Sequence, residues 1–282
     1  MTTTTLERFP NAKTFQAAIT PALRAKEIEN GLLLGITHGM ATVGVPGMFV
    51  AVTDSDGVRA AALRAPPHEI VLSLADPAQI KDLADALVSL DPMAPGVVGR
   101  ADLAEAFARR WSLRTGKATS LNHQIVLYAL NAVAPLTRAA PGALRVASDD
   151  DLPWLFEWTA AFSEEAKLVP VERERAFIER TVRAKVAASL LFVWSDADRP
   201  RAMVAYARGG VTGARIQHVY TPPEERRRGY ASAAVHALTW QLLSAGRTWC
   251  GLFADIENPQ SNRIYRRLGF TERGYFKSIA FR

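Results

Sequence analysis

Residues 226–231 read Arg-Arg-Arg-Gly-Tyr-Ala and stand between a strand pattern and a helix pattern. The run before them, residues 214–220 (ARIQHVY), is rich in β-branched and aromatic residues, as strands are. After them, apolar residues recur at helical spacing from Ala231 to Leu242. A loop in this place points consecutive backbone N–H groups, and the positive end of a helix, at one point in space. With Gly229 allowing close backbone approach, the stretch predicts an anion site suited to a pyrophosphate.

A second motif, Asn-Pro-Gln-Ser-Asn-Arg-Ile-Tyr-Arg-Arg-Leu-Gly-Phe, occupies residues 258–270. It predicts a short helix with both ends marked, because Asn258 suits an N-cap and Gly269 suits the position after the last turn. Asn258, Asn262 and Tyr265 are spaced four and three apart, so they share one face of that helix.

The two motifs resemble the signatures of the GNAT N-acetyltransferase superfamily. Arg226, Gly229 and Ala231 fill the three fixed positions of its acetyl-CoA signature, Gln/Arg-x-x-Gly-x-Gly/Ala after a strand. The second segment is similar to the C-terminal signature N-x-x-S/A-x-x-x-Y-x-x-x-G-F. The alternative for the loop is a solvated basic turn before a surface helix. The alternative for Tyr265 is a half-buried helix tyrosine with an incidental hydroxyl partner.

The resemblance implies acetyl-CoA as co-substrate, bound where the strand before the loop splays from its neighbour and leaves backbone groups free. The residues that the family pattern implies for this cofactor site are Val219, Tyr220, Thr221, Arg226, Arg227, Arg228, Gly229, Tyr230, Ala231, Ser232, Asn258, Asn262 and Tyr265. In the family the tyrosine hydroxyl lies near the CoA sulfur. A phenol is protonated at neutral pH and can give its proton to an emerging thiolate, so Tyr265 is the candidate general acid.

The general base is not marked by a motif. Members of the histone-modifying type use a glutamate in the strand before the loop, and Arg215 stands at that position here. His218 and Glu165 are the substitutes to consider, the first for its intrinsic pKa and the second because the helix it ends often lines the acceptor cleft. His218 can instead only pack, Glu165 can be a surface carboxylate, and a water chain can replace a dedicated base.

The rest of the C-terminal part follows the family's element order. Strands are expected at residues 144–147, 190–194, 202–207, 214–220, 249–254 and 275–281, and helices at 149–165, 172–187, 231–242 and 258–269. The resemblance therefore covers residues 142–282, the predicted GNAT acetyltransferase domain.

The N-terminal part has no motif but repeats this order. Helices are expected at residues 14–26, 28–40, 77–90 and 101–111, and strands at 48–52, 58–64, 69–73, 97–98 and 124–130. The order predicts a divergent GNAT-like domain over residues 1–137, without a cofactor motif because the crossover at residues 74–77 has neither Gly nor Arg. An unrelated α/β domain is the alternative. The fold class is thus α/β (α+β): a mixed, mostly antiparallel GNAT-type sheet flanked by helices, in tandem.

Composition sets the remaining expectations. The chain has 282 residues, 49% of them hydrophobic, a net charge of +6 and one cysteine, so no intrachain disulfide can form. No secretory signal is visible, and a cytoplasmic location is expected. The densest basic run is the one assigned to phosphates, and no aromatic-basic interleaving suggests a nucleic-acid groove. Neither a metal site nor a membrane segment is expected.

The sequence therefore predicts an N-acetyltransferase that moves an acetyl group from the CoA thioester to a primary amine. The acceptor stays open among small amines, amino acids, antibiotics and protein amino groups. A non-catalytic acetyl-CoA sensor or partner module is the alternative, and retention of Tyr265 with the full C-terminal motif favours the enzyme.

Overall fold

The computed structural model describes residues 4–136, 140–168 and 174–282. The N-terminal half contains β1 (Thr5–Arg8), α1 (Ala12–Leu23), η1 (Arg24–Lys26), α2 (Gly31–Val43), β2 (Met48–Asp54), β3 (Gly57–Arg64), β4 (Ile70–Leu72), α3 (Pro77–Leu90), β5 (Gly96–Arg100), α4 (Ala101–Thr115) and β6 (Thr119–Leu130). The C-terminal half contains β7 (Ala143–Val146), η2 (Asp149–Asp151), α5 (Leu152–Glu165), α7 (Arg175–Ala187), β8 (Leu191–Asp196), β9 (Arg199–Arg208), β10 (Ala214–Tyr220), η3 (Pro223–Glu225), α8 (Tyr230–Ser244), β11 (Cys250–Asp255), α9 (Pro259–Arg267) and β12 (Thr271–Phe281).

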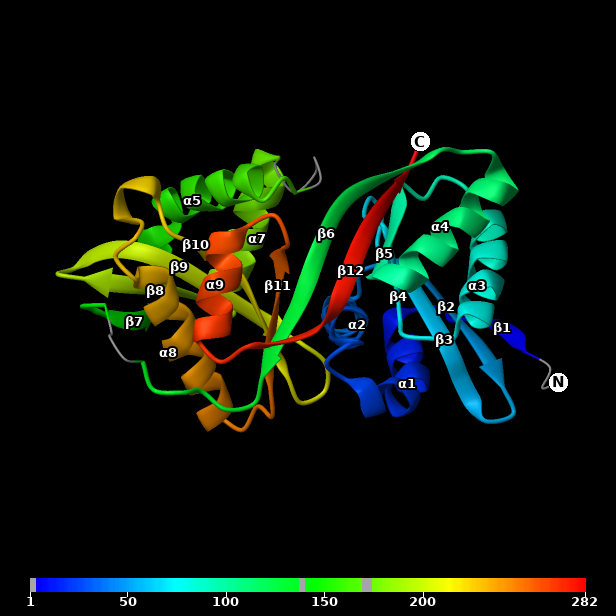
Figure 1. The fold of residues 1–282 in the computed structure, drawn as a ribbon, viewed down its shortest axis with the longest axis horizontal. Helices are drawn as coiled ribbons and strands as arrows, with labels where there is room; N and C mark the ends of the chain where they lie inside the picture. The colour runs from blue at the N-terminus through cyan, green and yellow to red at the C-terminus, as the bar shows by residue number, and fades with distance from the viewer. Residues whose placement is uncertain (1–3, 137–139, 169–173) are drawn as a thin grey trace.

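The two halves repeat one order of elements, as the sequence predicts. Each runs strand, two helices, three strands, helix, strand, helix, strand. All described strands join one sheet of twelve, in the order β1-β2-β3-β4-β5-β12-β6-β11-β10-β9-β8-β7. Most neighbours are antiparallel, and the described parallel pairs are β4 with β5 and β10 with β11. Figure 1 shows the halves as two lobes with β6 and β12 side by side between them. The fold is therefore a mixed, mostly antiparallel α/β sheet flanked by helices.

The last strands of the two halves are exchanged. β6 pairs with β11 from Leu130 beside Cys250 to Ile125 beside Asp255, and β12 pairs with β5 of the N-terminal half. The side chains follow the strands: Tyr128 of β6 lies in the core under α8, while Phe281 of β12 lies in the core of the N-terminal half. Each half therefore completes the other's sheet and core. The division into domains 1–137 and 142–282 stays a prediction, and the sheet runs continuously across it.

Several boundaries differ from the sequence predictions. The four-residue strand β1 was not predicted, β6 begins at Thr119, and α4 continues to Thr115. All four residues of β1 are exposed. Because a strand of this kind has no buried face, its sequence shows no alternation of apolar and polar residues that would predict it. The helix predicted over residues 172–187 begins at Arg175, and residues 172 and 173 lie outside the described part of the chain. No helix among the described residues is long and apolar enough to cross a membrane.

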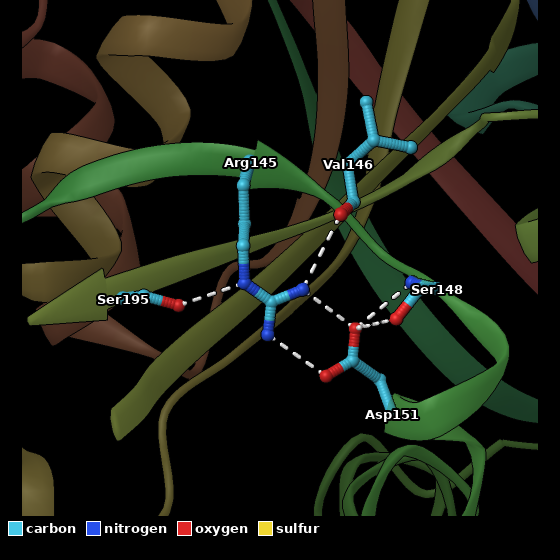
Figure 2. A network of polar contacts seen from close by, with 5 residues as sticks. All are labelled: Arg145, Val146, Ser148, Asp151 and Ser195. Atoms are coloured by element: carbon cyan, nitrogen blue, oxygen red, sulfur yellow. Dashed lines mark hydrogen bonds and ion pairs between the residues drawn. The ribbon is translucent and has the colours of Figure 1, made fainter. Parts of the chain in front are cut away.

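A polar network fixes the first helix of the C-terminal half to its first strand (Figure 2). Arg145 on β7 donates two hydrogen bonds, of 2.6 and 2.8 Å, to the carboxylate of Asp151. Asp151 also accepts a bond of 2.9 Å from the backbone N–H of Ser148, which completes a capping box at the start of this helical segment. Burial by itself raises the pKa of Asp151, but the hydrogen bonds from Arg145 and Ser148, together with the charge of Arg145, outweigh burial and leave the pKa below its usual value. The network sets the direction in which α5 leaves the sheet.

The carboxylate of Glu27 ties the two halves together. It accepts hydrogen bonds from the backbone N–H of Thr212 at 2.7 Å and of Gly213 at 3.2 Å, both in the β9–β10 connection. It also accepts bonds from the Thr212 hydroxyl at 3.1 Å and from the indole N–H of Trp249 at 3.3 Å. Nearby, α2 packs so closely on this connection that a Cβ on Gly31 would lie 2.4 Å from the carbonyl oxygen of Gly209.

We expect Glu27→Ala to lower the free energy of unfolding by about 3 kcal/mol, because it leaves several half-buried donors without an acceptor. Glu29→Ala is the matched control. Among the described residues Glu29 makes a single ion pair, of 3.0 Å with Arg273, whose side chain is 42% exposed, and its loss should cost less than about 1 kcal/mol. Urea titration measures both values. Equal losses in the two variants would show that Glu27 does not join the halves.

Candidate active site

The predicted anion loop has the backbone that its residues require. The chain leaves β10, forms η3, and enters α8 at Tyr230 with Gly229 as the N-cap residue in the left-handed region (φ 87°). Arg227 also has a positive φ, of 65°. Gly229 is exposed, and among the described residues a Cβ built there would meet only the Cβ of Ala140, at 3.7 Å. The N–H groups of the first turn of α8 have no intrahelical acceptor, so the loop presents donors and a positive helix end to a ligand.

The three arginines of the loop are not equivalent. Arg226 donates to both carboxylate oxygens of Glu165, at 2.7 and 2.8 Å, and to the carbonyl oxygen of Thr221 at 2.9 Å. Arg228 forms an ion pair of 3.1 Å with Glu225. Arg227 is exposed and, among the described residues, has no ion pair. Arg226 therefore braces the loop against α5, and Arg227 is the arginine whose charge is available to a ligand.

The side chain of Tyr230 points away from the loop. It is buried in the core, and its hydroxyl donates a hydrogen bond of 3.0 Å to Asp196 on β8. Of this predicted cofactor residue, only the backbone N–H faces the site.

β10 and β11 part after a short contact. They pair only at Ala214 with Cys250 and at Arg215 with Gly251, so the remainder of each strand lacks the other as a partner. On its other side, β10 changes register with β9 between Gln217 and Tyr220, where His218 has a φ of 52°. The splayed strand that the sequence motif implies is therefore present, and the backbone of Val219 and Tyr220 borders the opening.

Helix α9 closes one side of this opening. The side chain of Asn258 accepts a hydrogen bond of 3.0 Å from the N–H of Ser261, as an N-cap does. Asn262 donates bonds of 2.8 Å to the carbonyl oxygens of Asp255 and Asn258, which ties α9 to the end of β11. Its buried Oδ1 has no donor among the described residues. A buried unpaired acceptor beside an open groove is a position where a ligand amide can donate.

That groove follows α9 and has a volume of about 520 Å³. Its lining residues are Ile256, Pro259, Asn262, Arg263, Arg266 and Arg267. Arg266 is engaged by Glu272 at 2.7 Å. The groove therefore starts at the end of β11 and carries a positive charge that suits a polyanionic ligand.

Tyr265 lies in the same core cluster as Ile216 of β10 and Leu252 of β11. Its side chain is buried, and its hydroxyl makes no hydrogen bond with any described residue. Burial raises the pKa of Tyr265 to about 12. The phenol therefore keeps its proton throughout the physiological range.

Neither predicted base is in a favourable setting. Burial, together with the charges of Lys185 and Arg215, lowers the pKa of His218 to about 3, which makes its imidazole a weak proton acceptor. Its Nδ1 is buried without a partner among the described residues, and its ring packs on Phe162 at 5.4 Å. Glu165 is held by Arg226 at the surface end of α5. The geometry thus favours a structural role for Glu165 and disfavours His218 as the base.

The low pKa of His218 predicts that the stability of the protein depends on pH. Its imidazole takes a proton near pH 6.5 when unfolded and only near pH 3 when folded, so stability is lost as the pH falls below about 6.5. Between pH 6.5 and pH 5, the free energy of unfolding of the wild type should fall by about 1.5 kcal/mol more than that of His218→Gln. Urea titrations at the two pH values measure the difference, with His123→Gln as control. A wild-type loss that persists in His218→Gln would refute the assignment.

Two cations beside the opening were not predicted as functional. Lys185, on α7, continues the buried stripe of Ile178 and Val182, where a lysine breaks the apolar pattern. That break is the sequence signal that marks it. Arg215 stands where the family pattern has a glutamate and cannot serve as a base, and its Nε is buried without a partner among the described residues.

The corresponding crossover of the N-terminal half is closed to a phosphate. The N–H of Leu74 donates to Oδ1 of Asn30 at 2.8 Å, Asp76 stands at the helix start, and Pro77 has no N–H. The loop that can present free donors at this position lies in the C-terminal half.

Comparison with known proteins agrees with this geometry. Residues 200–278 match the family model described as FR47-like protein. The chain is similar in structure to a GNAT-family acetyltransferase from Colwellia psychrerythraea (13% identity, 98% of each chain, TM-score 0.59). It is also similar to a GCN5-related N-acetyltransferase from Sphaerobacter thermophilus (17% identity, 98% of this chain and 95% of that one, TM-score 0.60).

The chain is also similar in structure to a tandem GNAT protein from the clavulanic acid biosynthesis pathway. The similarity covers 99% of this chain and 98% of that one, with 10% identity and a TM-score of 0.54. A search of curated proteins found no match. The chain therefore has a GNAT fold over its whole length, arranged in tandem, with an FR47-like segment at residues 200–278.

Proposed function

We propose that the protein is an acetyl-CoA-dependent N-acyltransferase that moves the acetyl group from the CoA thioester to a primary amine. The observation that carries the proposal is the parting of β10 from β11 after Arg215 and Gly251. It leaves strand backbone without a partner next to the anion loop and next to the buried phenol of Tyr265. Unpaired strand backbone can hold the amides of a pantetheine arm, and the loop can hold the pyrophosphate.

Different groups of the chain bind different parts of acetyl-CoA. The N–H groups from Gly229 to Ser232 bind the phosphates, with Arg227 adding charge. The backbone of Val219, Tyr220 and Thr221 orients the arm and donates to the thioester oxygen, where negative charge develops during attack. The unpaired Oδ1 of Asn262 accepts from an amide N–H of the arm.

The transfer forms one C–N bond and breaks one C–S bond. The amine nitrogen attacks the thioester carbon, the sulfur leaves with the bonding electron pair, and the phenol of Tyr265 gives that sulfur its proton. The amine loses one proton in exchange. Because His218 is a weak base and Glu165 is bound to Arg226, we assign this second proton to water rather than to a side chain. Tyr265 regains its proton from solvent.

The N-terminal half contributes one wall of the acceptor side. A small cavity of about 10 Å³ beside Arg215 is lined from that half by Ile28 and Leu32 and from the C-terminal half by Phe253 and Gly251. The ring of His68 packs edge-on against the ring of Phe177 on α7, with ring centres 6.1 Å apart. The cavity lining and this ring contact both bring N-terminal residues next to the elements that flank the opening.

A thiol-release assay tests the proposal. Acetyl-CoA is incubated with the protein and a panel of primary amines, and free CoA is measured together with the acetylated amine. The enzyme predicts amine-dependent release with one acetylated product per thiol. Tight binding of acetyl-CoA without release over the whole panel would instead support a non-catalytic sensor module.

A further inference from the structure

Three basic side chains lie near one another on the face of the sheet that α5 and α7 cover, where the charges of Lys185 and Arg215 both act on His218. Arg215 comes from β10 next to the point where the strands part, His218 from the irregular turn of the same strand, and Lys185 from the last turn of α7. His218 packs against Phe162 of α5. The cluster therefore lies beside the opening, on the side opposite the core under α8.

Among the described residues, no carboxylate pairs with Lys185 or Arg215. Neither Lys185 nor Arg215 forms an ion pair or a side-chain hydrogen bond with any described residue, and Nε of Arg215 and Nδ1 of His218 are buried without partners. Burial is the main cause that lowers the pKa of Lys185 to about 8 and that of Arg215 to about 10. The charge of Arg215 lowers the pKa of Lys185 further. Two like charges that are partly desolvated and have no counter-ion among the described residues are costly to a fold, so their presence calls for an anion.

The site leaves room for a ligand to reach both cations. Arg215 and Lys185 are each only half-buried as whole side chains. The cavity beside Arg215 holds about one water and is too small for an oxyanion, so a ligand would meet the guanidinium at the exposed part of its side chain. Phosphates of CoA are already provided for by the loop at the start of α8, on the far side of β10.

We propose that Arg215 and Lys185 form a subsite for an oxyanion group, carboxylate or phosphate, of the amine acceptor. This inference rests on the proposed function and narrows its acceptor to amines that also carry a negative charge. A planar guanidinium and an ammonium together match the two oxygens of such a group. The subsite would hold the acceptor by its anionic end and leave its amine to reach the thioester.

The test compares acceptors with and without a negatively charged group. Amino acids are paired with their carboxamides, and phosphoethanolamine with ethanolamine, and kcat/KM is measured for each. The wild type should prefer the charged member, and the pair that shows the larger preference identifies carboxylate or phosphate. In Arg215→Met and Lys185→Met this preference should fall about ten- to hundredfold, mainly through KM. Arg199→Met and Lys13→Met, at exposed positions, should keep it.

Two further measurements separate a ligand site from a structural role. Removing an unpaired desolvated charge should leave the melting temperature of Arg215→Met and Lys185→Met equal to or above that of the wild type; a structural ion pair would lower it. Inorganic phosphate, titrated in a Gly229→Glu background to remove the loop site, should stabilise the Arg199→Met and Lys13→Met controls more than the two cluster variants.

The outcomes distinguish the inference from the proposed function. Thiol release with equal use of charged and neutral acceptors in every variant keeps the function and overturns the subsite. Absence of release with every amine removes the function, and the phosphate titration then decides the subsite alone: equal stabilisation of all variants overturns it.

Discussion

Gly229→Glu should abolish acetyl-CoA binding, with at least about a hundredfold loss of affinity, while the protein stays folded. The added carboxylate would stand at the N-cap of α8, where phosphate charge should lie, and would repel it. The fold should survive because Gly229 is exposed and, among the described residues, a Cβ there meets only Ala140, at 3.7 Å.

Calorimetry measures the affinity and circular dichroism the fold. Gly229→Ala is the matched control, because it carries the same cost of a side chain at a φ of 87° without the charge. It should bind acetyl-CoA more tightly than Gly229→Glu. Unchanged affinity in a folded Gly229→Glu protein would remove the loop from the site.

Tyr265→Phe should lower kcat by about 100- to 10,000-fold and leave the acetyl-CoA Kd nearly unchanged. The hydroxyl would act on charge that develops only in the transition state, which is where general acid catalysis gains its effect. The substitution keeps the ring in its buried place and removes a hydroxyl that no described residue binds, so stability should hold.

The control for this variant is Tyr128→Phe. Tyr128 is another buried tyrosine, with its ring centre 6.1 Å from that of Tyr265 and its hydroxyl 3.4 Å from Glu272. Its loss should leave kcat close to the wild-type value. Wild-type turnover in Tyr265→Phe, where chemistry limits the rate, would make Tyr265 a structural residue only.

The elements could be predicted from the sequence because each has a local signal. α3 has the predicted bounds, with an apolar stripe of Ile80, Leu83, Ala84 and Leu87, and β10 also has the predicted bounds. The loop and α9 were marked by Gly229 and by the cap residue Asn258. These signals depend on residues within a turn or two of one another, so one sequence suffices to detect them.

The exchange of β6 and β12 could not be predicted in this way. Both strands put apolar residues on a buried face and can pair with either half, so no local pattern selects the partner. The bond between Arg226 and Glu165 joins residues far apart in the chain, so no local pattern could indicate it. The low pKa of His218 depends in part on the charge of Lys185, which belongs to another element.

The exchange also decides how the N-terminal half must be tested. A fragment ending near residue 135 would lack β12, whose Ile279 and Phe281 complete its core, and would carry β6 without β11. Its failure to bind a ligand would therefore reflect loss of fold. The intact chain is the proper material.

The central claim is that one acetyl-CoA binds per chain, at the opening between β10 and β11. Calorimetric titration of the intact protein with acetyl-CoA tests it most directly. The claim predicts a stoichiometry near one, because the crossover of the N-terminal half is closed by Asn30, Asp76 and Pro77. Two equivalent sites per chain, or no binding, would contradict it.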